Sequence, residues 1–570
     1  MAAGLGGCAV GPDFIAAAPP LVDRYTPEPL TRIGGQRLCA ACEIPQRWWE
    51  VFHNKNLNRL IDATIAHNPS MDAARAAIRI AYYGAEAQKG FFLPTLLGNA
   101  TDAWNYQSPV QNVVSPNAPT NPYGLLTKQL SVSYTPDIWG ANRRAVESLE
   151  AQTEQQRYQL EATYLSLTSN VAAAAVQEAA LRGQVAATRE VIHEARQMLD
   201  ILRKQYAIGA VAVADVLAQE ALLAQMEQLL PPLEKALAQQ RDLLTALAGQ
   251  YSTAEVPETF NLKAITLPRD LPVTLPAGFV RQRPDVRQAE ANMHAASAQI
   301  GVAIAARLPN ITLSANAGYT GYSLAQLFMP GTGFYVLAGS VTQPIFDGFT
   351  LLNKQKAAEV GLTQAEAQYR QAVITAFQNV ADALRALQAD TKAVAAAVHA
   401  EVVARKSFEI VKQQFLMKEG SAVNMLAVLT AEQIWLQAAV TRMAAEGARL
   451  GDVVGLFMAL GGGWQDQNLK NLPPSGPQTP SPEQIASING PVNPSWFPSV
   501  FDRESADDRQ PPPPKPPPPL VPVAPAAVPA PAPFLPPAPA ALPPPAAALL
   551  PAAPGASPGG PSGWLPNFLE

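Results

Sequence analysis

The sequence predicts a mainly α-helical protein with a membrane β-barrel, assembled from a duplicated unit of long coiled-coil helices and two β-hairpins. Three observations predict this fold class. The chain carries a very long uninterrupted helical pattern, it has short segments with one apolar and one polar face, and both features recur in its second half. Two-faced strands that continue into rods of this length favour a pore carried on a tube.

A strand and a rod follow one another in the first half. The predicted strand 125–138 alternates Leu130, Val132 and Tyr134 with polar side chains, so each of its faces has one character. Beyond Gly140 mostly apolar residues step by three and four, which is typical of a coiled-coil seam. These residues are Val185, Thr188, Ile192, Ala195, Leu199, Leu202 and Tyr206. A helix over this stretch would be about 100 Å long, which no compact domain needs.

The same arrangement is found twice in the chain. Pro69 and Pro94 recur as Pro284 and Pro309, both 215 residues later and with no gap between them. The first proline of each pair starts a helix and the second ends one. Other residues match at the same offset, namely Ala74, Ala76, Ala81 and Leu93 with Ala289, Ala291, Ala296 and Leu308. We therefore expect a duplicated unit of helix, two strands, long helix and returning helix.

These patterns divide the chain into five parts. Residues 1–45 form a lipoprotein N-terminus and extended lead, 46–250 the first repeat, 251–282 a connector, 283–463 the second repeat, and 464–570 a Pro/Ala-rich disordered tail. We expect strands at about 96–106, 125–138, 311–323 and 334–346, and long helices over 141–208, 214–250, 350–417 and 424–460. We interpret the tail as a solvated spacer, and the alternatives are that it docks to a proline-recognising partner or that it threads the cell wall.

Two consecutive prolines, Pro231 and Pro232, lie inside the returning helix of the first repeat. A proline removes a backbone N–H and crowds the preceding turn of a helix. We therefore expect the segment 214–250 to be two helices in series.

Composition excludes several classes of protein. A net charge of −5 gives no sign of a nucleic-acid partner. No segment approaches the ~20 strongly apolar residues of a membrane-spanning helix, so a membrane would be crossed by a closed barrel. Four strands are too few, since bacterial barrels have at least about eight, but a homotrimer would supply twelve. The polar side chains would then face inward, namely Ser131, Ser133, Thr135, Thr312, Ser314 and Asn316.

The three cysteines suggest two separate roles. Leu5-Gly6-Gly7-Cys8 resembles a bacterial lipoprotein box, although only seven residues precede Cys8 and none is basic. The true start codon would then lie upstream, and a chance cysteine is the alternative. Cys39 and Cys42 form a CxxC pair with no second Cys or His pair nearby, which disfavours zinc. A disulfide in an oxidising compartment is favoured over two free thiols.

The chain resembles the outer-membrane factors of tripartite efflux systems, the TolC/OprM superfamily, and most closely their NodT-type lipoproteins. The resemblance covers residues 5 to about 463. The segments that carry it are Leu5–Phe14, Trp48-Trp49, Tyr134–Arg143, Leu275-Pro276, Val280–Arg287, Ala305–Pro309 and Pro344–Gly348.

The resemblance implies a homotrimer with a 12-stranded outer-membrane barrel and a periplasmic α-helical barrel. It implies a passive exit duct for drugs or other small molecules, lipid-anchored in the cell outer membrane and extending into the periplasm. The implied partners are a periplasmic membrane-fusion adaptor, an inner-membrane RND transporter and outer-membrane lipid. The residue after Cys8 is Ala9, which is compatible with sorting to the outer membrane.

The resemblance also assigns the hairpin tips. The adaptor is expected to meet Gly209, Ala210 and Val211 at the first tip and Gly420, Ser421 and Ala422 at the second. Relatives often carry an acidic ring just past the second tip glycine, whereas Val423 and Asn424 here are uncharged. The gate candidates are therefore Val423, Asn424 and Asp215, and an apolar constriction is favoured. Asp215 has the alternative role of capping the returning helix.

No catalytic constellation appears in the sequence. The five histidines are scattered, and there is no phosphate-binding loop, no nucleophile elbow and no metal-ligand spacing. We therefore expect neither enzymatic activity nor a cofactor or metal. Two alternatives to an efflux duct stay open: the outer component of a type I protein-secretion system, and a periplasmic coiled-coil scaffold between envelope layers. Four two-faced strands argue against the scaffold.

Overall fold

The computed structural model describes residues 9–18, 20, 22, 24–28, 32–39, 42, 44–106, 122–273, 282–417 and 424–462. The chain divides into two units, Met1–Gly476 and Pro477–Glu570, and all the described residues belong to the first. The predicted tail, 464–570, lies outside the described residues.

The first half of this unit runs from a short turn to a helical hairpin. The turn η1 (Trp48–Phe52) precedes α1 (Lys55–His67) and α2 (Pro69–Lys89). After η2 (Gly90–Phe92), strands β3 (Thr95–Asn105) and β4 (Tyr123–Tyr134) lead to α3 (Ala141–Ala207) and α4 (Val213–Leu247). The side chain of Asn68 caps α2, and Pro69 lies in its first turn, where a missing N–H costs nothing.

The second half repeats this order. It contains α6 (Pro284–Ala305), β6 (Asn310–Gly321), β7 (Gly333–Thr342), α7 (Thr350–Met417) and α8 (Met425–Ala459). The two first helices of the hairpins have 67 and 68 residues, and the two returning helices have 35 residues each. The duplication seen in the sequence is therefore a duplication of structure.

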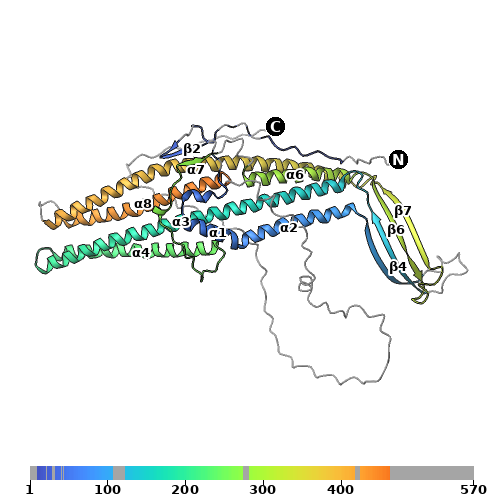
Figure 1. Ribbon diagram of the computed structural model, residues 1–570, viewed down its shortest axis with the longest axis horizontal. Coiled ribbons are helices and arrows are strands. Elements are labelled where there is room, and N and C mark those ends of the chain that lie inside the picture. Colours follow the sequence, from blue (N-terminus) through green and yellow to red (C-terminus); the bar gives the residue numbers. More distant parts are fainter. Residues whose placement is uncertain are drawn as a thin grey trace, which may run out of the picture. The chain divides into compact units, whose positions relative to one another are not determined.

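The long helices form two antiparallel pairs, α3 with α4 and α7 with α8, and α8 also packs along α3 (Figure 1). Near the strands, α2 packs on α3, and α6 packs on both α3 and α7. With 67 residues, α3 is about 100 Å long. Among the described helices, none combines the length and the apolar character that a membrane span requires.

The predicted break at Pro231 and Pro232 is wrong, because α4 continues through both prolines. Each proline deprives one carbonyl in the preceding turn of its hydrogen bond. Both prolines are exposed on the outer side of α4, so water can satisfy those carbonyls. Packing of α4 along α3 then holds the helix together where local propensity would end it.

Two large hydrophobic cores hold the described helices together, and a smaller cluster around Met71, Leu160 and Leu167 joins α2 to α3. The first surrounds Trp48, Trp49 and Phe52, which are fully buried and join α1 to α3, α7, α8 and the connector. The rings of Trp48 and Phe457 stack with centroids 5.3 Å apart. The second core lies between α3, α4, α7 and α8, in the halves of these helices nearer the hairpin turns.

A small sheet packs beside the first core. It consists of β1 (Arg32–Ile33), β2 (Gln36–Cys39) and β5 (Asp270–Pro272), and β2 pairs antiparallel to β1 and parallel to β5. The β1–β2 turn approaches α7 so closely that a Cβ on Gly34 would lie 2.5 Å from a Thr391 methyl carbon. At the end of β2, Cys39 and Cys42 are joined by a disulfide.

Candidate functional site

The four long strands form one antiparallel sheet in the order β3-β4-β6-β7. Ser131 lies opposite Leu97 on one side and Asn316 on the other. Directly opposed residues share a face of the sheet. One face therefore collects mostly polar side chains, namely Thr95, Asn99, Thr101, Thr127, Gln129, Ser131, Ser133, Thr312, Ser314, Asn316, Thr320 and Ser340. The alternation in the sequence predicted this face.

The opposite face is mostly apolar and uncovered. It carries Leu96, Trp104, Leu126, Leu130, Val132, Tyr134, Ile311, Leu313, Tyr319, Tyr335, Leu337 and Val341. Tyr335 and Leu337 are 78% and 75% exposed. Its charged side chains, Asp102 and Lys128, lie toward the end of the sheet away from the helices. Within the described sheet, β3 and β7 are edge strands, and their outer backbone groups are unpaired. Open edges and an exposed apolar face are both typical of surfaces that pair with another chain or with lipid.

The first hairpin tip is closed by a left-handed glycine. Gly209 has φ +73°, its N–H donates to the Tyr206 carbonyl at 2.9 Å, and the Ala210 N–H donates to the Gln205 carbonyl at 2.8 Å. These two bonds satisfy the last carbonyls of α3 in a Schellman motif. Gly209 is exposed, and Ala210 and Val211 are partly exposed, so the predicted adaptor-docking residues of this tip are accessible.

Asp215 is tied to the start of α4. Its Oδ2 accepts a hydrogen bond from the backbone N–H of Ala212 at 3.3 Å, and its own N–H donates to the Ala212 carbonyl at 3.1 Å. An acidic residue in the first turn also interacts favourably with the helix dipole. This geometry favours the helix-capping role for Asp215 over a role in the gate.

At the second tip, Gly420, Ser421, Ala422 and Val423 lie outside the described residues. Asn424 is described, and its Oδ1 accepts the Ala427 N–H at 3.1 Å to cap α8. Because the Asn424 side chain caps α8, its position is explained by helix capping, which argues against Asn424 as a gate residue.

The N-terminal lead docks where the sheet meets the helices. The Val10 N–H donates to the Trp139 carbonyl at 3.0 Å. Arg144, which is buried, donates to the Val10 carbonyl at 3.2 Å and to Asp13 Oδ1 at 2.7 Å. Phe14 stacks on the His294 ring with centroids 4.4 Å apart. Sequence reasoning missed Arg144. Two adjacent arginines, Arg143 and Arg144, lie in the first turn of α3, but nothing in the sequence links them to residues 9–14.

Cys8 itself lies outside the described residues. Its neighbour Ala9 is described and lies against Gly140, where an added Cβ would be 2.6 Å from the Ala9 Cα. Gly140 has φ +76° and directly precedes α3, so only glycine allows the lead to pass this close to the junction of β4 and α3.

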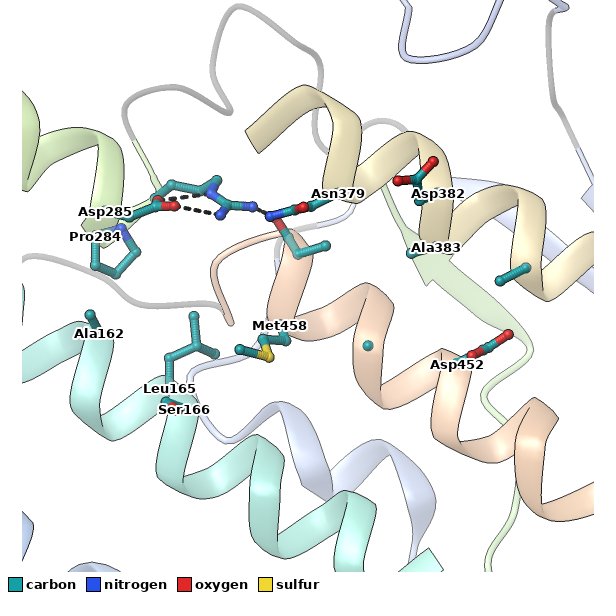
Figure 2. A pocket seen from close by; sticks show the side chains of 14 residues that line it. Ala162, Leu165, Ser166, Pro284, Asp285, Asn379, Asp382, Ala383, Asp452 and Met458 are labelled. Carbon is teal, nitrogen blue, oxygen red and sulfur yellow. Dashed lines mark hydrogen bonds and ion pairs between the residues drawn. The ribbon is translucent and has the colours of Figure 1, made fainter. Parts of the chain in front are cut away.

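A cavity of about 470 Å³ lies between α3, α6, α7 and α8 (Figure 2). On one side Asp285 forms an ion pair with Arg283, and on the other lie Asp382 and Asp452. Burial and the hydrogen-bonded carboxyl of Asp390 raise the pKa of Asp452 to about 6. Among the described residues, no three His, Cys, Asp or Glu side chains gather closely enough to hold a metal ion.

Two stretches of the chain, residues 60–250 and 279–462, match the family model described as outer membrane efflux protein. The chain belongs to the outer membrane efflux protein family. The two matched stretches correspond to the two structural repeats, so each repeat of this chain matches the family model once. The efflux protein is accordingly located at the outer membrane and acts as a channel component.

Curated relatives cover most of this efflux protein. The pyoverdine export outer membrane protein OpmQ of Pseudomonas putida is 28% identical over 434 residues, 74% of this chain and 88% of its own. The cation efflux system protein CusC of Escherichia coli is 27% identical and covers 82% and 98% of the two chains. Nodulation protein T of Rhizobium leguminosarum is 25% identical and covers 85% and 94%.

Solved structures show the same fold. The outer membrane protein VceC of Vibrio cholerae superposes with a TM-score of 0.67 at 25% identity, over 74% of this chain and 100% of its own. The CmeC outer membrane channel of Campylobacter jejuni gives a TM-score of 0.72 at 21% identity, over 81% and 98%. The predicted fold class, long helical hairpins with a separate β domain, is therefore confirmed.

Proposed function

We propose that this efflux protein is the passive exit duct of a tripartite pump, and that it works as a homotrimer. The observation that carries the proposal is the four-stranded sheet, with one polar face, one exposed apolar face and two open edges. Edge β3 of one copy would pair with edge β7 of the next, so three copies would close a sheet of twelve strands. Its apolar faces would meet lipid and its polar faces would line the lumen.

The helices support the same assembly. α7 exposes Val360, Ile374 and Val402, which are 66%, 62% and 55% accessible in the single chain. A row of exposed apolar side chains on a long helix favours packing against a helix of a neighbouring copy. In a trimer, α3, α4, α7 and α8 of three copies would continue the duct as a periplasmic helical barrel.

The tips of the two hairpins are the proposed docking surface for a periplasmic adaptor, which would connect the duct to an inner-membrane RND transporter. The residues proposed are Gly209, Ala210, Val211, Gly420, Ser421 and Ala422. Because Asp215 is engaged as a cap, closure at rest would depend on an apolar constriction that includes Val423. The protein would not be an enzyme, since its work is to let molecules pass and not to transform them.

A lipid on Cys8 would anchor the protein in the outer membrane. The support is the position of Ala9 and Val10, which dock at the junction between sheet and helices. In the proposed assembly this junction lies at the periplasmic surface of the membrane. An acyl chain on the residue before Ala9 would therefore start at the correct level to enter the inner leaflet.

Two neighbouring residues of β7 provide a matched test. Leu337 is opposite Ala315 on the apolar face, and Val336 is opposite Asn316 on the polar face. We expect Leu337→Lys to abolish outer-membrane trimers and drug resistance, since a lysine facing lipid costs about 2–4 kcal/mol at mid-bilayer. Val336→Lys would face water in the lumen and should be tolerated. SDS-resistant trimers in outer-membrane fractions and antibiotic susceptibility are the measurements. Equal tolerance of both lysines would refute the proposed orientation of the sheet.

A further inference from the structure

A hydrogen bond between two fully buried side chains links the two helical hairpins. Gln219 of α4 and Glu432 of α8 both have 0% exposure, and they lie within the second core. Gln219 Nε2 donates to Glu432 Oε2 at 3.1 Å and to the Ala195 carbonyl of α3 at 3.2 Å. α8 packs along α3 and α7 but approaches α4 over only a short stretch, so this contact is a principal link between α4 and α8.

The two remaining oxygens of this pair are unsatisfied. Gln219 Oε1 and Glu432 Oε1 are buried and have no hydrogen-bond partner among the described residues. Both are acceptors, so neither can help the other while Glu432 is ionised. One proton on Glu432 changes this, because a carboxylic acid and a primary amide can form two parallel hydrogen bonds. The acid O–H would then donate to Gln219 Oε1 while Gln219 Nε2 donates to Glu432.

The charged groups around Glu432 come from α3 and α7. Lys412 Nζ pairs with Glu194 Oε2 at 2.7 Å, and farther along the same interface Arg405 pairs with Glu190 at 3.3 Å. α4 contributes the neutral Gln219. Burial is the largest influence and raises the pKa of Glu432 to about 7, while Gln219 and Lys412 lower it and Glu194 raises it. Lys412 and Glu194 form an ion pair and shift the pKa of Glu432 in opposite directions, so burial remains the dominant influence on this pKa.

We propose that Gln219 and Glu432 form a proton-dependent latch between the two hairpins, closed when Glu432 is protonated and weakened when it ionises. The latch is a property of the chain itself. Its consequence for transport, easier separation of α4 from α8 and of the periplasmic end of the duct as the pH rises, rests on the proposed function.

The direction of the effect follows from linkage. A glutamate exposed by opening has an ordinary pKa near 4.5, whereas the latched glutamate has a raised pKa of about 7. Below both pKa values the latch contributes its full stabilisation to the closed arrangement of the hairpins. This stabilisation falls as the pH rises from the lower pKa to the higher one. Each unit of difference changes the opening equilibrium about tenfold.

Hydrogen–deuterium exchange of the full-length protein in detergent micelles tests the latch, at pH 5 and pH 8 with rates corrected for intrinsic exchange. In wild type we expect opening in peptides from residues 213–226 and 425–436 to be at least about tenfold greater at pH 8. Glu432→Gln keeps a neutral partner for Gln219, so its exchange should stay slow at both pH values. Glu220→Gln makes the same change next to Gln219 on an exposed side chain that pairs with Arg203, and should behave as wild type.

A second pair of variants guards against a general loss of folding. Gln219→Leu leaves the carboxylate without its donor and should increase opening, most of all at pH 8. Adding Glu432→Leu should restore protection and remove the pH dependence. The latch is overturned if wild type and Glu432→Gln respond alike to pH, or if Glu220→Gln removes the response. If the wild-type protein shows the pH-dependent exchange but confers no export, the proposed function is refuted and the latch is supported.

Discussion

Gly209 and Gly249 occupy equivalent positions just after α3 and α4, with φ +73° and +75°. Their surroundings differ. A Cβ on Gly209 would meet open space, whereas one on Gly249 would lie 2.5 Å from the His67 carbonyl oxygen. We expect Gly209→Ala to destabilise by about 1 kcal/mol, the cost of a left-handed alanine. Gly249→Ala should destabilise more, because backbone must also move.

Thermal unfolding of the two alanine variants in detergent gives the comparison. Gly84→Ala serves as the control, since this helical glycine has open space around its Cβ position and a helical alanine stabilises. Equal melting temperatures for the variants at 209 and 249 would mean that the close contact with His67 does not exist in solution.

Glu178 is a fully buried carboxylate that holds the connector against α3. It accepts hydrogen bonds from Arg182 and Arg241, and from the Phe260 N–H at 3.1 Å. We expect Glu178→Ala to cost about 1–3 kcal/mol, mainly because the buried Phe260 N–H loses its acceptor. Arg241 keeps its ion pair with Glu255, and Arg182 is partly exposed to water. Glu234→Ala removes a solvent-exposed partner of Arg189 and should cost less than about 1 kcal/mol. Similar melting temperatures for both variants would contradict this role of Glu178.

At this scale the sequence is a partial guide. The tip glycines can be recognised in the sequence because glycine is rare inside helices. The Cys39–Cys42 pair can be recognised because closely spaced cysteines have few roles. Glu178, Gln219 and Glu432 were not singled out, since their importance depends on which helix covers them. A signal was nevertheless present for Glu432, which lies between Val428 and Trp435 on the apolar seam of α8. A charged residue at such a position requires a partner.

Among the elements, the pairing of α7 with α8 contains a second titrating contact. Asp452 of α8 is hydrogen-bonded to Asp390 of α7, and burial together with that second carboxyl raises its pKa to about 6. A raised pKa means that folding is favoured when Asp452 is protonated, so stability is lost as the pH rises toward and beyond 6. We expect Asp452→Asn to raise the melting temperature at pH 7.5 and to leave it nearly unchanged at pH 4.

Asp382→Asn is the matched control, since Asp382 is an exposed carboxylate in the same cavity (Figure 2). Melting curves of the three proteins from pH 4 to pH 8 provide the measurement. A melting temperature of Asp452→Asn that follows wild type throughout would show that burial and Asp390 do not raise the pKa of Asp452.

Elements differ in how far sequence determines them. Strand faces were predictable because a shift of one residue would exchange every polar and apolar side chain. The continuity of α4 was not predictable, because the penalty at Pro231 and Pro232 is local whereas the packing of α4 on α3 extends over the whole helix. Sequence patterns report local preferences, and a long interface can override a single unfavourable turn.

For the whole molecule, the fold class was predictable because duplication and length leave few arrangements. One hairpin consists of helices of 67 and 35 residues, and the other of helices of 68 and 35 residues. Helices of this length cannot be folded into a compact domain. Family membership is evident from the same two stretches. The assembly is less directly encoded, since trimer closure depends on edges β3 and β7 that one chain leaves open. The docking of residues 9–14 on Arg144 was likewise hidden, because a proline-containing lead has no periodic pattern.

The Pro/Ala-rich tail follows the second repeat in the sequence. The family match ends at residue 462, and both repeats are complete by the end of α8. Since neither the sheet nor the hairpins include residues 471–570, we expect a deletion of these residues to leave export unchanged. Antibiotic susceptibility of a deletion strain complemented with the truncated gene is the measurement, with protein level checked by immunoblot. Loss of resistance at an unchanged level of outer-membrane trimer would assign the tail a direct part in export.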